Sequence, residues 1–276
     1  MALLGATGRM GASLLKVLSH DSRFVLVGAS GGAQSLHEGV DVATRAGLPP
    51  CGVKLTSDLS KVLAFAQVAI DFSHASALPA HLDACVRAGV SLVIGTTGLD
   101  ETSLRRLDEA SRCIALLHAP NMNLGVAVLT RLVREAAALL PADYDVEIIE
   151  AHHRYKKDAP SGTALALGAA VAQGRGGDHD TLAVRNRAMV GGERAPGTIG
   201  YAVLRAGDTV GEHTVWLAGS GERLELKHVA TDRATFARGA LAAAFFLATQ
   251  KPGLYALSDV LNSSGHNTRA RLSPQT

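Results

Sequence analysis

The segment from Glu150 to Gly168, EAHHRYKKDAPSGTALALG, concentrates residue types that can move protons and bind anions. His152 and His153 can donate a proton near neutral pH, a role to which lysine is not suited at its ordinary pKa. Lys156 adds a positive charge, and Ser161 precedes an alanine-rich run with the composition of a helix. This combination favours proton transfer beside a site for a small anion.

The start of that predicted helix provides the anion site. Pro160 suits a helix start and Ser161 is a good N-cap, which leaves the backbone N–H groups of Gly162 and Thr163 in the first turn. Such groups bind carboxylates, helped by the helix dipole. Each charge-assisted hydrogen bond contributes roughly 1.5–3 kcal/mol. A few of them and a lysine would hold a small dicarboxylate at micromolar affinity.

The same segment also has other interpretations. His152 and His153 are adjacent, so in an extended chain they point to opposite faces and do not readily chelate one ion. Positive neighbours also oppose a cation, and we expect no metal. A solvated basic face remains an alternative. A plain helix cap would explain Ser161 but not the histidine pair.

Near the N-terminus, Gly5, Gly8 and Gly11 lie between a short apolar run and a helical pattern. Glycines there let the backbone approach a pyrophosphate, which the helix N-terminus also attracts. The spacing is G-x-x-G-x-x-G rather than the stricter G-x-G-x-x-G, and a structural glycine turn is the alternative. Dinucleotide binding is the interpretation favoured by the position of this loop in an alternating strand–helix pattern.

Two further loops follow predicted strands directly. They are Gly95–Gly98, GTTG, and Ala119–Met122, APNM. Taken singly, each could be ordinary turn chemistry. Open α/β sheets nevertheless bind ligands at the carboxyl ends of strands, so the three loops together indicate one crevice. Residues 28–32, GASGG, contain neither the acidic group that binds a ribose hydroxyl nor an arginine for a 2′-phosphate, so both NADH and NADPH are compatible.

Strand and helix patterns alternate through the first half of the chain. Apolar runs predict strands at 24–27, 68–72, 90–94 and 113–117, and helical spacing predicts helices near 76–88 and 100–112. This alternation is typical of a doubly wound parallel α/β sheet.

The second half has a different pattern. We expect a helix at 124–139, a strand at 146–149 and a helix from 161 to about 173, followed by a loop at 175–196 with one strand near 182–188. Runs at 199–205, 213–218 and 223–229 predict antiparallel strands, and a final helix spans 235–249. Lys251-Pro252-Gly253 then ends that helix.

Composition sets wider limits. With 276 residues, 47% of them hydrophobic, the chain can form two domains with substantial cores. A formal charge of +2 is too small for a nucleic-acid-binding surface. Three widely spaced cysteines without a CxxC pair favour reduced thiols in the cytoplasm. There is neither a signal-peptide pattern nor an apolar run of about 18 residues, so we expect no membrane segment.

Several motifs resemble one family, the 4-hydroxy-tetrahydrodipicolinate (dihydrodipicolinate) reductases. In order along the chain they are GATGRMG at 5–11, DFS at 71–73, GTTG at 95–98, APNMN at 119–123, EAHHRYKKDAPSGTA at 150–164 and RAGDTVGEHTVWLAG at 205–219. The resemblance spans nearly the whole chain, and the fifth motif is highly specific.

The resemblance implies a Rossmann-type nucleotide domain, residues 1–123 and 232–276. It also implies an α+β domain with a mixed open sheet, residues 124–231, for substrate binding and assembly into a homotetramer. His152 would be the proton donor, and Lys156 would assist proton transfer and bind substrate. The substrate carboxylates would be held by His153, Ser161, Gly162, Thr163 and Arg233. NADH or NADPH would be lined by Gly5, Ala6, Thr7, Gly8, Arg9, Met10, Gly95, Thr96, Thr97, Ala119, Pro120, Asn121 and Met122.

One departure from the family pattern concerns the cofactor. Relatives often carry Glu, with or without Arg, where this chain has Gly31-Gly32, so the family's cofactor preference does not transfer. Two rival functions stay open at this point. One is another NAD(P)-dependent dehydrogenase of amino-acid metabolism, and the other is a non-catalytic NAD(P)-binding sensor. The intact His152 and Lys156 argue against the sensor.

Overall fold

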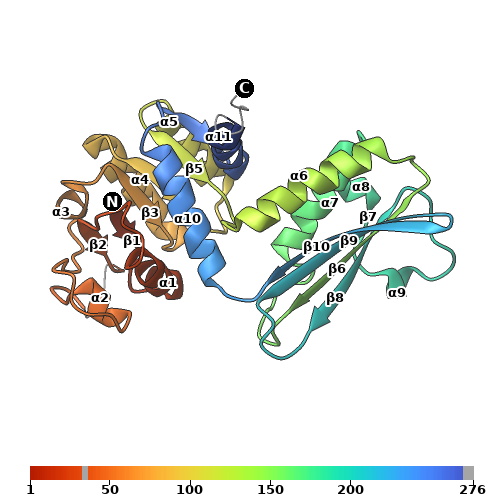
Figure 1. Ribbon diagram of the computed structural model, residues 1–276, viewed down its shortest axis with the longest axis horizontal. Helices are drawn as coiled ribbons and strands as arrows, with labels where there is room; N and C mark the ends of the chain where they lie inside the picture. The colour runs from red at the N-terminus through yellow and green to blue at the C-terminus, as the bar shows by residue number, and fades with distance from the viewer. Residues whose placement is uncertain (33–36, 270–276) are drawn as a thin grey trace, which may run out of the picture. The chain divides into compact units, whose positions relative to one another are not determined.

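The computed structural model describes residues 1–32 and 37–269 of the chain (Figure 1). The chain divides into two compact units, Met1–Leu124 with Ala234–Thr276, and Gly125–Arg233. Each unit has its own sheet.

The first unit contains a six-stranded parallel sheet with the order β11-β5-β4-β3-β1-β2. Its strands are β1 (Ala2–Leu4), β2 (Gly28–Ser30), β3 (Val68–Asp71), β4 (Ser91–Ile94), β5 (Ala115–His118) and β11 (Gly253–Tyr255). The chain passes from β1 to β2 on one side and then to β3 on the other side of β1. The order therefore reverses at β1, and the predicted doubly wound parallel sheet is confirmed.

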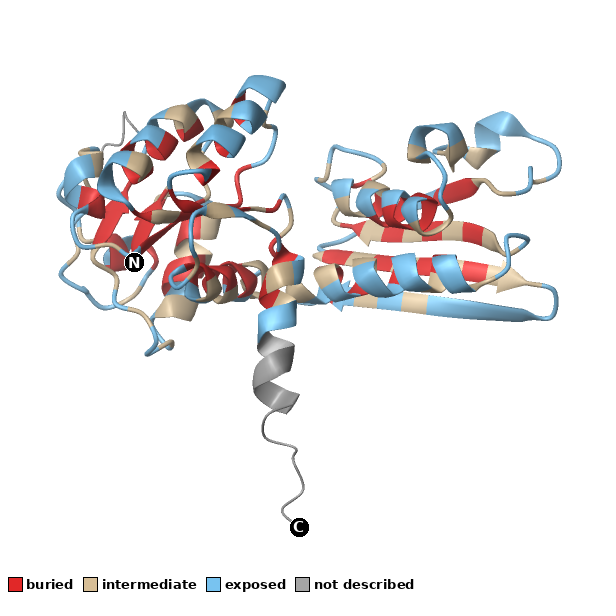
Figure 2. Cartoon of the chain, turned by 90° about the horizontal axis from the view of Figure 1, so that it is seen from above, coloured by how far each residue is buried: buried red, intermediate tan, exposed pale blue. Residues whose placement is uncertain are grey.

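Helices cover both faces of this sheet (Figures 1 and 2). On one face lie α3 (Leu59–Leu63), α4 (Leu78–Ala88) and α5 (Glu101–Ser111), and on the other lie α1 (Arg9–Leu18) and α10 (Ala234–Leu247). Strand residues Leu4, Leu92 and Ile94 belong to the core under α3 to α5, and alternate residues such as Leu3 and Ile70 are equally buried. Burial on both faces explains why these strands are continuous apolar runs. The remaining elements are α2 (Val42–Arg45), η1 (Ala75–Ala77) and α11 (Leu257–Arg269).

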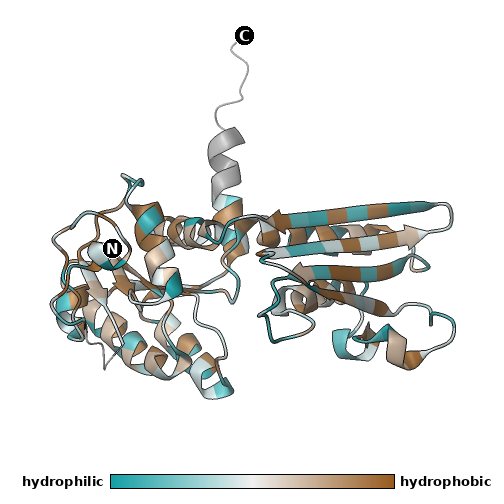
Figure 3. Ribbon diagram, turned by 90° about the horizontal axis from the view of Figure 1, so that it is seen from below, coloured by the Kyte–Doolittle hydropathy of each residue, from teal (hydrophilic) through white to brown (hydrophobic). Residues whose placement is uncertain are grey.

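The second unit contains a five-stranded mixed sheet with the order β10-β9-β6-β8-β7. Its strands are β6 (Asp145–His152), β7 (Ala183–Val184), β8 (Ile199–Arg205), β9 (Gly211–Gly219) and β10 (Glu222–Ala230). Figure 3 shows the alternation of apolar and polar residues along the long strands. One face packs on α6 (Leu124–Leu139) and α7 (Gly162–Gly174), with Ile148 and Val215 in that core. The short helices α8 (His179–Leu182) and α9 (Arg187–Val190) complete the unit.

The predicted strand at 24–27 is wrong, because the strand beside β1 is Gly28–Ser30. Val25 is 73% exposed, and the ring of Phe24 packs edge-on against Phe245, outside the sheet. A Cβ built on Gly28 would lie 2.0 Å from the carbonyl oxygen of Val62. The sheet therefore accepts the small residues after the apolar run, since the neighbouring backbone leaves no room for a side chain.

The second half also departs from expectation in places. β8 pairs in parallel with β6, not antiparallel with its successor, because the chain reaches it through the crossover helix α7. Only β9 and β10 form the expected hairpin. The region predicted as one strand at 182–188 contains β7 between two short helices, and β11 and α11 were not predicted. Within the described residues, no helix is both long and apolar enough to cross a membrane.

Candidate active site

The last residues of β6 form the centre of the candidate site. Alternate residues of this strand are buried, and Val146 and Ile148 face the helices. Glu150 and His152 continue the same alternation, because residues two apart on a strand share a face. Glu150 is 0% exposed and His152 is 8% exposed. A pattern that buries apolar side chains at one end of the strand thus buries an acid and a base at the other.

Glu150 is the hub of a hydrogen-bond network. Its Oε2 atom lies 2.5 Å from Nδ1 of His152. Arg205, the residue opposite His152 on β8, forms a bidentate pair with the same carboxylate, with both distances 2.8 Å. The backbone N–H of Ser161 donates to Oε1 at 3.0 Å. Every oxygen of this buried carboxylate is therefore paired, as buried charges require.

The protonation of this network follows from its contacts. Burial alone would raise the pKa of Glu150, but hydrogen bonds from His152, Arg205 and Ser161 outweigh burial and lower it to about 2. Glu150 is consequently an anion at neutral pH and holds the proton on Nδ1 of His152. Among the described residues, the His152 ring is hydrogen-bonded through Nδ1 alone, which leaves Nε2 as the atom that can exchange a proton with a ligand.

The turn after β6 brings the predicted anion-binding groups to the same end of the sheet. Ser161 is the N-cap of α7, and its hydroxyl accepts the N–H of Ala164 at 3.2 Å, as predicted. Nζ of Lys156 lies 2.9 Å from Asp158. Burial would raise the pKa of Asp158, but Lys156 and the N–H of Gly162 outweigh it and lower that pKa. Lys156 and Gly162 thus already stabilise one carboxylate, that of the chain itself.

His153 and Arg233 complete the positive surroundings. Desolvation first, and then the positive charge of Arg233, lowers the pKa of His153. The positive charge of Arg233, which follows β10, therefore acts on the His153 ring. Arg154 and Lys157 of the same segment are exposed. The second unit thus gathers all the residues predicted for proton transfer and substrate binding, namely His152, His153, Lys156, Ser161, Gly162, Thr163 and Arg233.

Three residues of the site carried no predicted role. Glu150 and Arg205 form the network above, and His213 contacts both Ser161 and His152, with its Nε2 3.1 Å from the serine hydroxyl and its ring 5.1 Å from the His152 ring. Strand alternation could have identified Glu150, since it lies two residues before His152. Arg205 and His213 lie in the RAGDTVGEHTV motif, but only the strand register brings them opposite His152 and Glu150.

In the first unit, the predicted cofactor loops lie along one edge of the parallel sheet. The loop Gly5–Met10 follows β1, Gly95–Thr97 follows β4 and Ala119–Met122 follows β5. Backbone hydrogen bonds join them to neighbouring strands, from Ala6 to Ser30, from Gly95 to Asp71 and from Ala119 to Ile94. The structure therefore gathers these residues at the carboxyl ends of adjacent strands, beside the point where the strand order reverses.

The loop after β1 fits a dinucleotide pyrophosphate. Gly5 has a φ of +79°, and a Cβ there would lie 2.9 Å from the carbonyl oxygen of Phe72, so only glycine suits the position. Gly8 caps α1 without a side chain of its own. The first turn of α1 carries Arg9 as its charged side chain, and its N–H groups face the loop. This cradle suits a phosphate group at the start of a ten-residue helix.

A buried acid lies beneath the GTTG loop. Asp71, at the end of β3, is 0% exposed and lies 2.8 Å from Nδ1 of His81 on α4. The other carboxylate oxygen accepts the N–H of Ser73 at 2.7 Å and the hydroxyl of Thr96 at 3.3 Å. Thr96 is itself 3% exposed, so this network fixes the backbone of a predicted cofactor loop.

Comparisons with known proteins identify the family. Residues 1–122 match the model of the dihydrodipicolinate reductase N-terminus, and residues 125–261 match that of the C-terminus. A 4-hydroxy-tetrahydrodipicolinate reductase of Thiobacillus denitrificans is 47% identical over 95% of this chain and 97% of its own. That of Nitrosomonas eutropha is 45% identical over the same shares.

Solved structures share the fold. A dipicolinate-bound dihydrodipicolinate reductase from Paenisporosarcina sp. TG-14 aligns with a TM-score of 0.73 at 23% identity, over 92% of this chain and 96% of the other. An amine dehydrogenase from Mycobacterium smegmatis aligns at 0.61 with 14% identity, over 93% and 94%. The two family models together cover nearly the whole sequence, and the relatives match across almost their entire length. The chain therefore belongs to the dihydrodipicolinate reductase family, the NAD(P)H-dependent oxidoreductases of lysine and diaminopimelate biosynthesis.

Proposed function

We propose that this protein reduces the cyclic imine derived from 4-hydroxy-tetrahydrodipicolinate to tetrahydrodipicolinate with His152 as the proton donor. The observation that carries the assignment is the buried Glu150, which pairs with Nδ1 of His152 and leaves Nε2 as the exchangeable position. Reduction of a conjugated imine requires a hydride and a proton. The proton needs a group that ionises near neutral pH, and histidine is such a group.

Glu150 and Arg205 support His152 in this role. The carboxylate pairs with Nδ1 and orients the imidazole, so that Nε2 is the position from which a proton can be delivered to the substrate. Arg205 balances the charge of Glu150 through two hydrogen bonds of 2.8 Å. After the proton leaves Nε2, the ring is neutral and remains hydrogen-bonded to Glu150. Solvent can then reprotonate it for the next turnover.

Substrate binding would use the positive groups around the start of α7. The substrate is a small dicarboxylate, and the solved relative from Paenisporosarcina holds the dicarboxylate dipicolinate. Lys156 and the Gly162 N–H already stabilise the Asp158 carboxylate, which supports their use for a carboxylate of the substrate. Ser161 and Thr163 would add polar contacts. His153 and Arg233 would bind the second carboxylate of the substrate.

The hydride would come from NADH or NADPH, which supplies reducing equivalents when bound. Its pyrophosphate would lie on the N–H groups of Gly5–Met10 at the start of α1. The loops Gly95–Thr97 and Ala119–Met122 would line the remainder of the cofactor. Asp71 would keep Thr96 in place beneath it through the hydroxyl contact of 3.3 Å.

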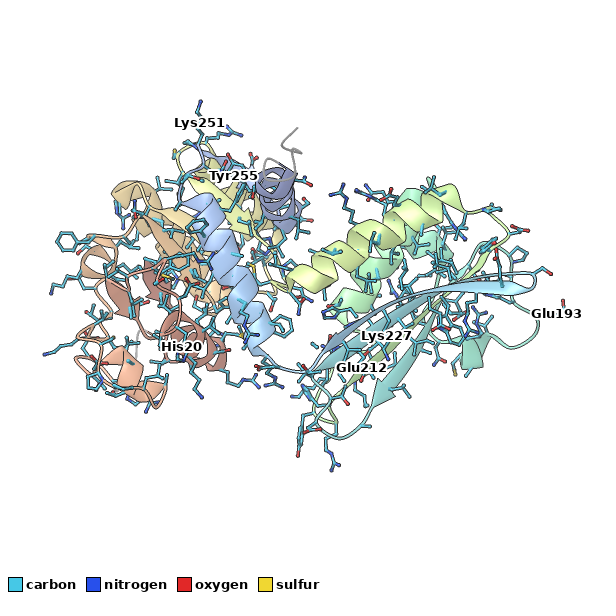
Figure 4. The ribbon with its side chains drawn as sticks, viewed as in Figure 1. His20, Glu193, Glu212, Lys227, Lys251 and Tyr255 are labelled. Atoms are coloured by element: carbon cyan, nitrogen blue, oxygen red, sulfur yellow. The ribbon has the colours of Figure 1, made fainter. Side chains whose placement is uncertain are left out.

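The test is turnover with freshly prepared substrate and each cofactor in turn, followed by loss of the near-ultraviolet absorbance of NADH or NADPH. Wild-type protein should oxidise at least one of them in a substrate-dependent manner. His152→Gln should lower kcat by about 10²–10⁴-fold, and Lys156→Ala should raise KM as well as lower kcat. His20→Gln is the control, because His20 is exposed on the first unit (Figure 4). No turnover by the wild type, or a kcat for His152→Gln within a factor of about two, contradicts the assignment.

We also propose that the protein is a cytoplasmic homotetramer that assembles through the sheet of the second unit. Ile149 and Thr214 are register partners on the face that points away from the α6–α7 core, and Trp216 lies on that face beneath the guanidinium of Arg223 at 4.0 Å. Glu212 and Lys227 pair across the same face at 3.1 Å (Figure 4). Light scattering should give fourfold the chain mass, and Ile149→Lys should reduce it. A monomeric wild type would refute the tetramer.

A further inference from the structure

The hydroxyl of Ser161 is held by two neighbours inside the second unit. The residue is 2% exposed, and its oxygen accepts the N–H of Ala164 at 3.2 Å as the N-cap of α7. The same oxygen lies 3.1 Å from Nε2 of His213. A serine hydroxyl has one proton to donate and two acceptor positions. The direction of the serine proton depends on which of the two atoms, Ser161 Oγ or His213 Nε2, donates in this hydrogen bond.

The surroundings of His213 decide the direction of this hydrogen bond. His213 is 4% exposed, and its other ring nitrogen, Nδ1, is sealed from solvent with no partner among the described residues. A proton on Nδ1 would therefore be a buried donor without an acceptor, which proteins rarely leave, whereas an unpaired lone pair is better tolerated. The neutral ring then carries its proton on Nε2. Nε2–H donates to Ser161.

The ring stays neutral because of where it lies. Burial, and next the positive charge of His152, lowers the pKa of His213 to about 4. The groups around it are His152 and Glu150 on β6, His228 opposite it on β10, Lys156 in the turn after β6, and Ser161. Within the described residues, these histidines and acids do not form a set that could hold a metal ion. The contact of His213 with Ser161 is therefore interpreted as a hydrogen bond and not as part of a metal site.

We infer that His213 is a positioning residue that sets the direction of the Ser161 hydroxyl. One acceptor position is taken by the Ala164 N–H and the other by His213 Nε2–H. No described residue accepts the serine proton, so that proton is left to be donated to a ligand. Ser161 becomes an obligate donor, and this suits a carboxylate, which can only accept. His213 thereby tunes carboxylate binding without touching the substrate. The inference rests on the proposed role of Ser161 in substrate binding.

A double-mutant cycle tests this coupling. His213→Phe removes the donor but keeps a ring of similar size against His152, whose ring lies 5.1 Å away in an edge-on contact. It should raise KM, and the Kd for dipicolinate, by about tenfold with kcat changed less than about threefold. In a Ser161→Ala background, the same substitution should change Kd by less than about twofold. His213→Gln, whose side-chain N–H₂ can occupy the place of Nε2–H, should recover most of the affinity.

Two further variants complete the experiment. His179→Phe is the matched control, because His179 is also a partly buried histidine of the second unit and is bonded to Tyr201 at 2.6 Å, away from this cluster. It should lower stability without changing KM. If His213→Phe does not fold, His213→Asn replaces it, since the shorter amide can stand in for Nδ1 but cannot reach Ser161.

The outcomes separate the two proposals. An equal effect of His213→Phe with and without the serine hydroxyl, or a fall in kcat at constant KM, overturns the positioning role while leaving the proposed function intact. If wild-type protein neither turns over substrate nor binds dipicolinate by calorimetry, the proposed function fails and takes this inference with it. Loss of coupling in the Ser161→Ala background together with recovery by His213→Gln supports the inference.

Discussion

Nδ1 of His152 lies 2.5 Å from Oε2 of Glu150, a residue only two positions earlier on the same strand. Residues two apart on a strand share a face, so the backbone of β6 itself sets this acid beside this base. The pair occupies the end of a row whose earlier members, Val146 and Ile148, lie in the apolar core. The base is thus positioned by a rigid element, and its partner is buried deeply enough to keep water away from the contact.

Replacing the acid should therefore disable the base. Glu150→Gln keeps the size of the side chain but removes the charged acceptor that orients the His152 ring through Nδ1, and we expect kcat to fall by about 10²-fold with a smaller change in KM. Glu147→Gln is the matched control, because Glu147 lies on the other face of β6 and pairs with Arg187 and Arg194. Steady-state kinetics decide the matter. A kcat for Glu150→Gln within threefold of wild type would remove Glu150 from the mechanism.

A second prediction concerns the space beside Nε2 of His152. A Cβ at Gly211 would lie 3.1 Å from that atom, closer than ordinary van der Waals contact. Gly211→Ala should displace the ring from its working position and lower kcat by about 10- to 100-fold. Thr214→Ala, on the opposite face of β9, should leave kcat unchanged. Unaltered kinetics in Gly211→Ala would show that the ring has room to move without cost.

Gly162 allows packing and binding to be separated. A Cβ at this position, the first residue of α7, would meet nothing within 4 Å in the protein. Gly162→Ala should therefore fold with undiminished stability, since alanine is the better helix former. It should nevertheless raise KM by about tenfold, because the methyl group would lie where a carboxylate approaches the backbone N–H. Urea unfolding and kinetics on the same preparation check both parts. An unchanged KM would exclude Gly162 from the binding site.

The pH dependence of stability should report His213. Its pKa is about 4 in the folded protein and 6.5 ordinarily, so the folded state binds fewer protons and loses stability as the pH falls from 6.5 towards 4. Trp216, the single tryptophan of the chain, lies on the same strand and reports unfolding of the second unit. Urea unfolding followed by its fluorescence should show this loss in wild type and a shallower slope in His213→Phe. The same slope in both proteins would contradict the assignment.

Glu150 predicts a separate and more acidic transition. Its pKa of about 2 lies below the ordinary value of 4.5, so its stabilising contribution is complete above pH 4.5 and is lost as the pH falls towards 2. In Glu150→Gln this acid limb should flatten, while the limb between pH 6.5 and 4 remains. The same fluorescence measurement resolves the two limbs. A wild-type curve that is flat below pH 4.5 would show that Glu150 is not held in its charged form.

Local patterns were sufficient for much of the fold. Continuous apolar runs predicted the buried parallel strands, and helical spacing with an N-cap at Ser161 predicted α7. They failed where a neighbour set the outcome. The apolar run at 24–27 looks like a strand by itself, but the backbone of Val62 admits only Gly28 beside β1. The pattern of residues 199–205 predicts an antiparallel strand, but β8 is parallel to β6 because a crossover helix joins the two, and the sequence of the strand alone does not show this.

The combination of residues that suits proton transfer and anion binding can be recognised from the chain alone, because histidine, lysine and a serine-capped helix start lie within one short segment and need no distant contact to be brought together. The hydrogen-bond partners that orient these groups come from distant parts of the chain and are brought to them by folding. Arg205 and His213 lie more than fifty residues along the chain from the glutamate and the serine they contact, at |i−j| of 55 for Arg205–Glu150 and 52 for His213–Ser161. Strand register, rather than local spacing, sets which of them faces Glu150 and which faces His152. Register is fixed by burying one face of the whole sheet, and that is a property of the folded unit.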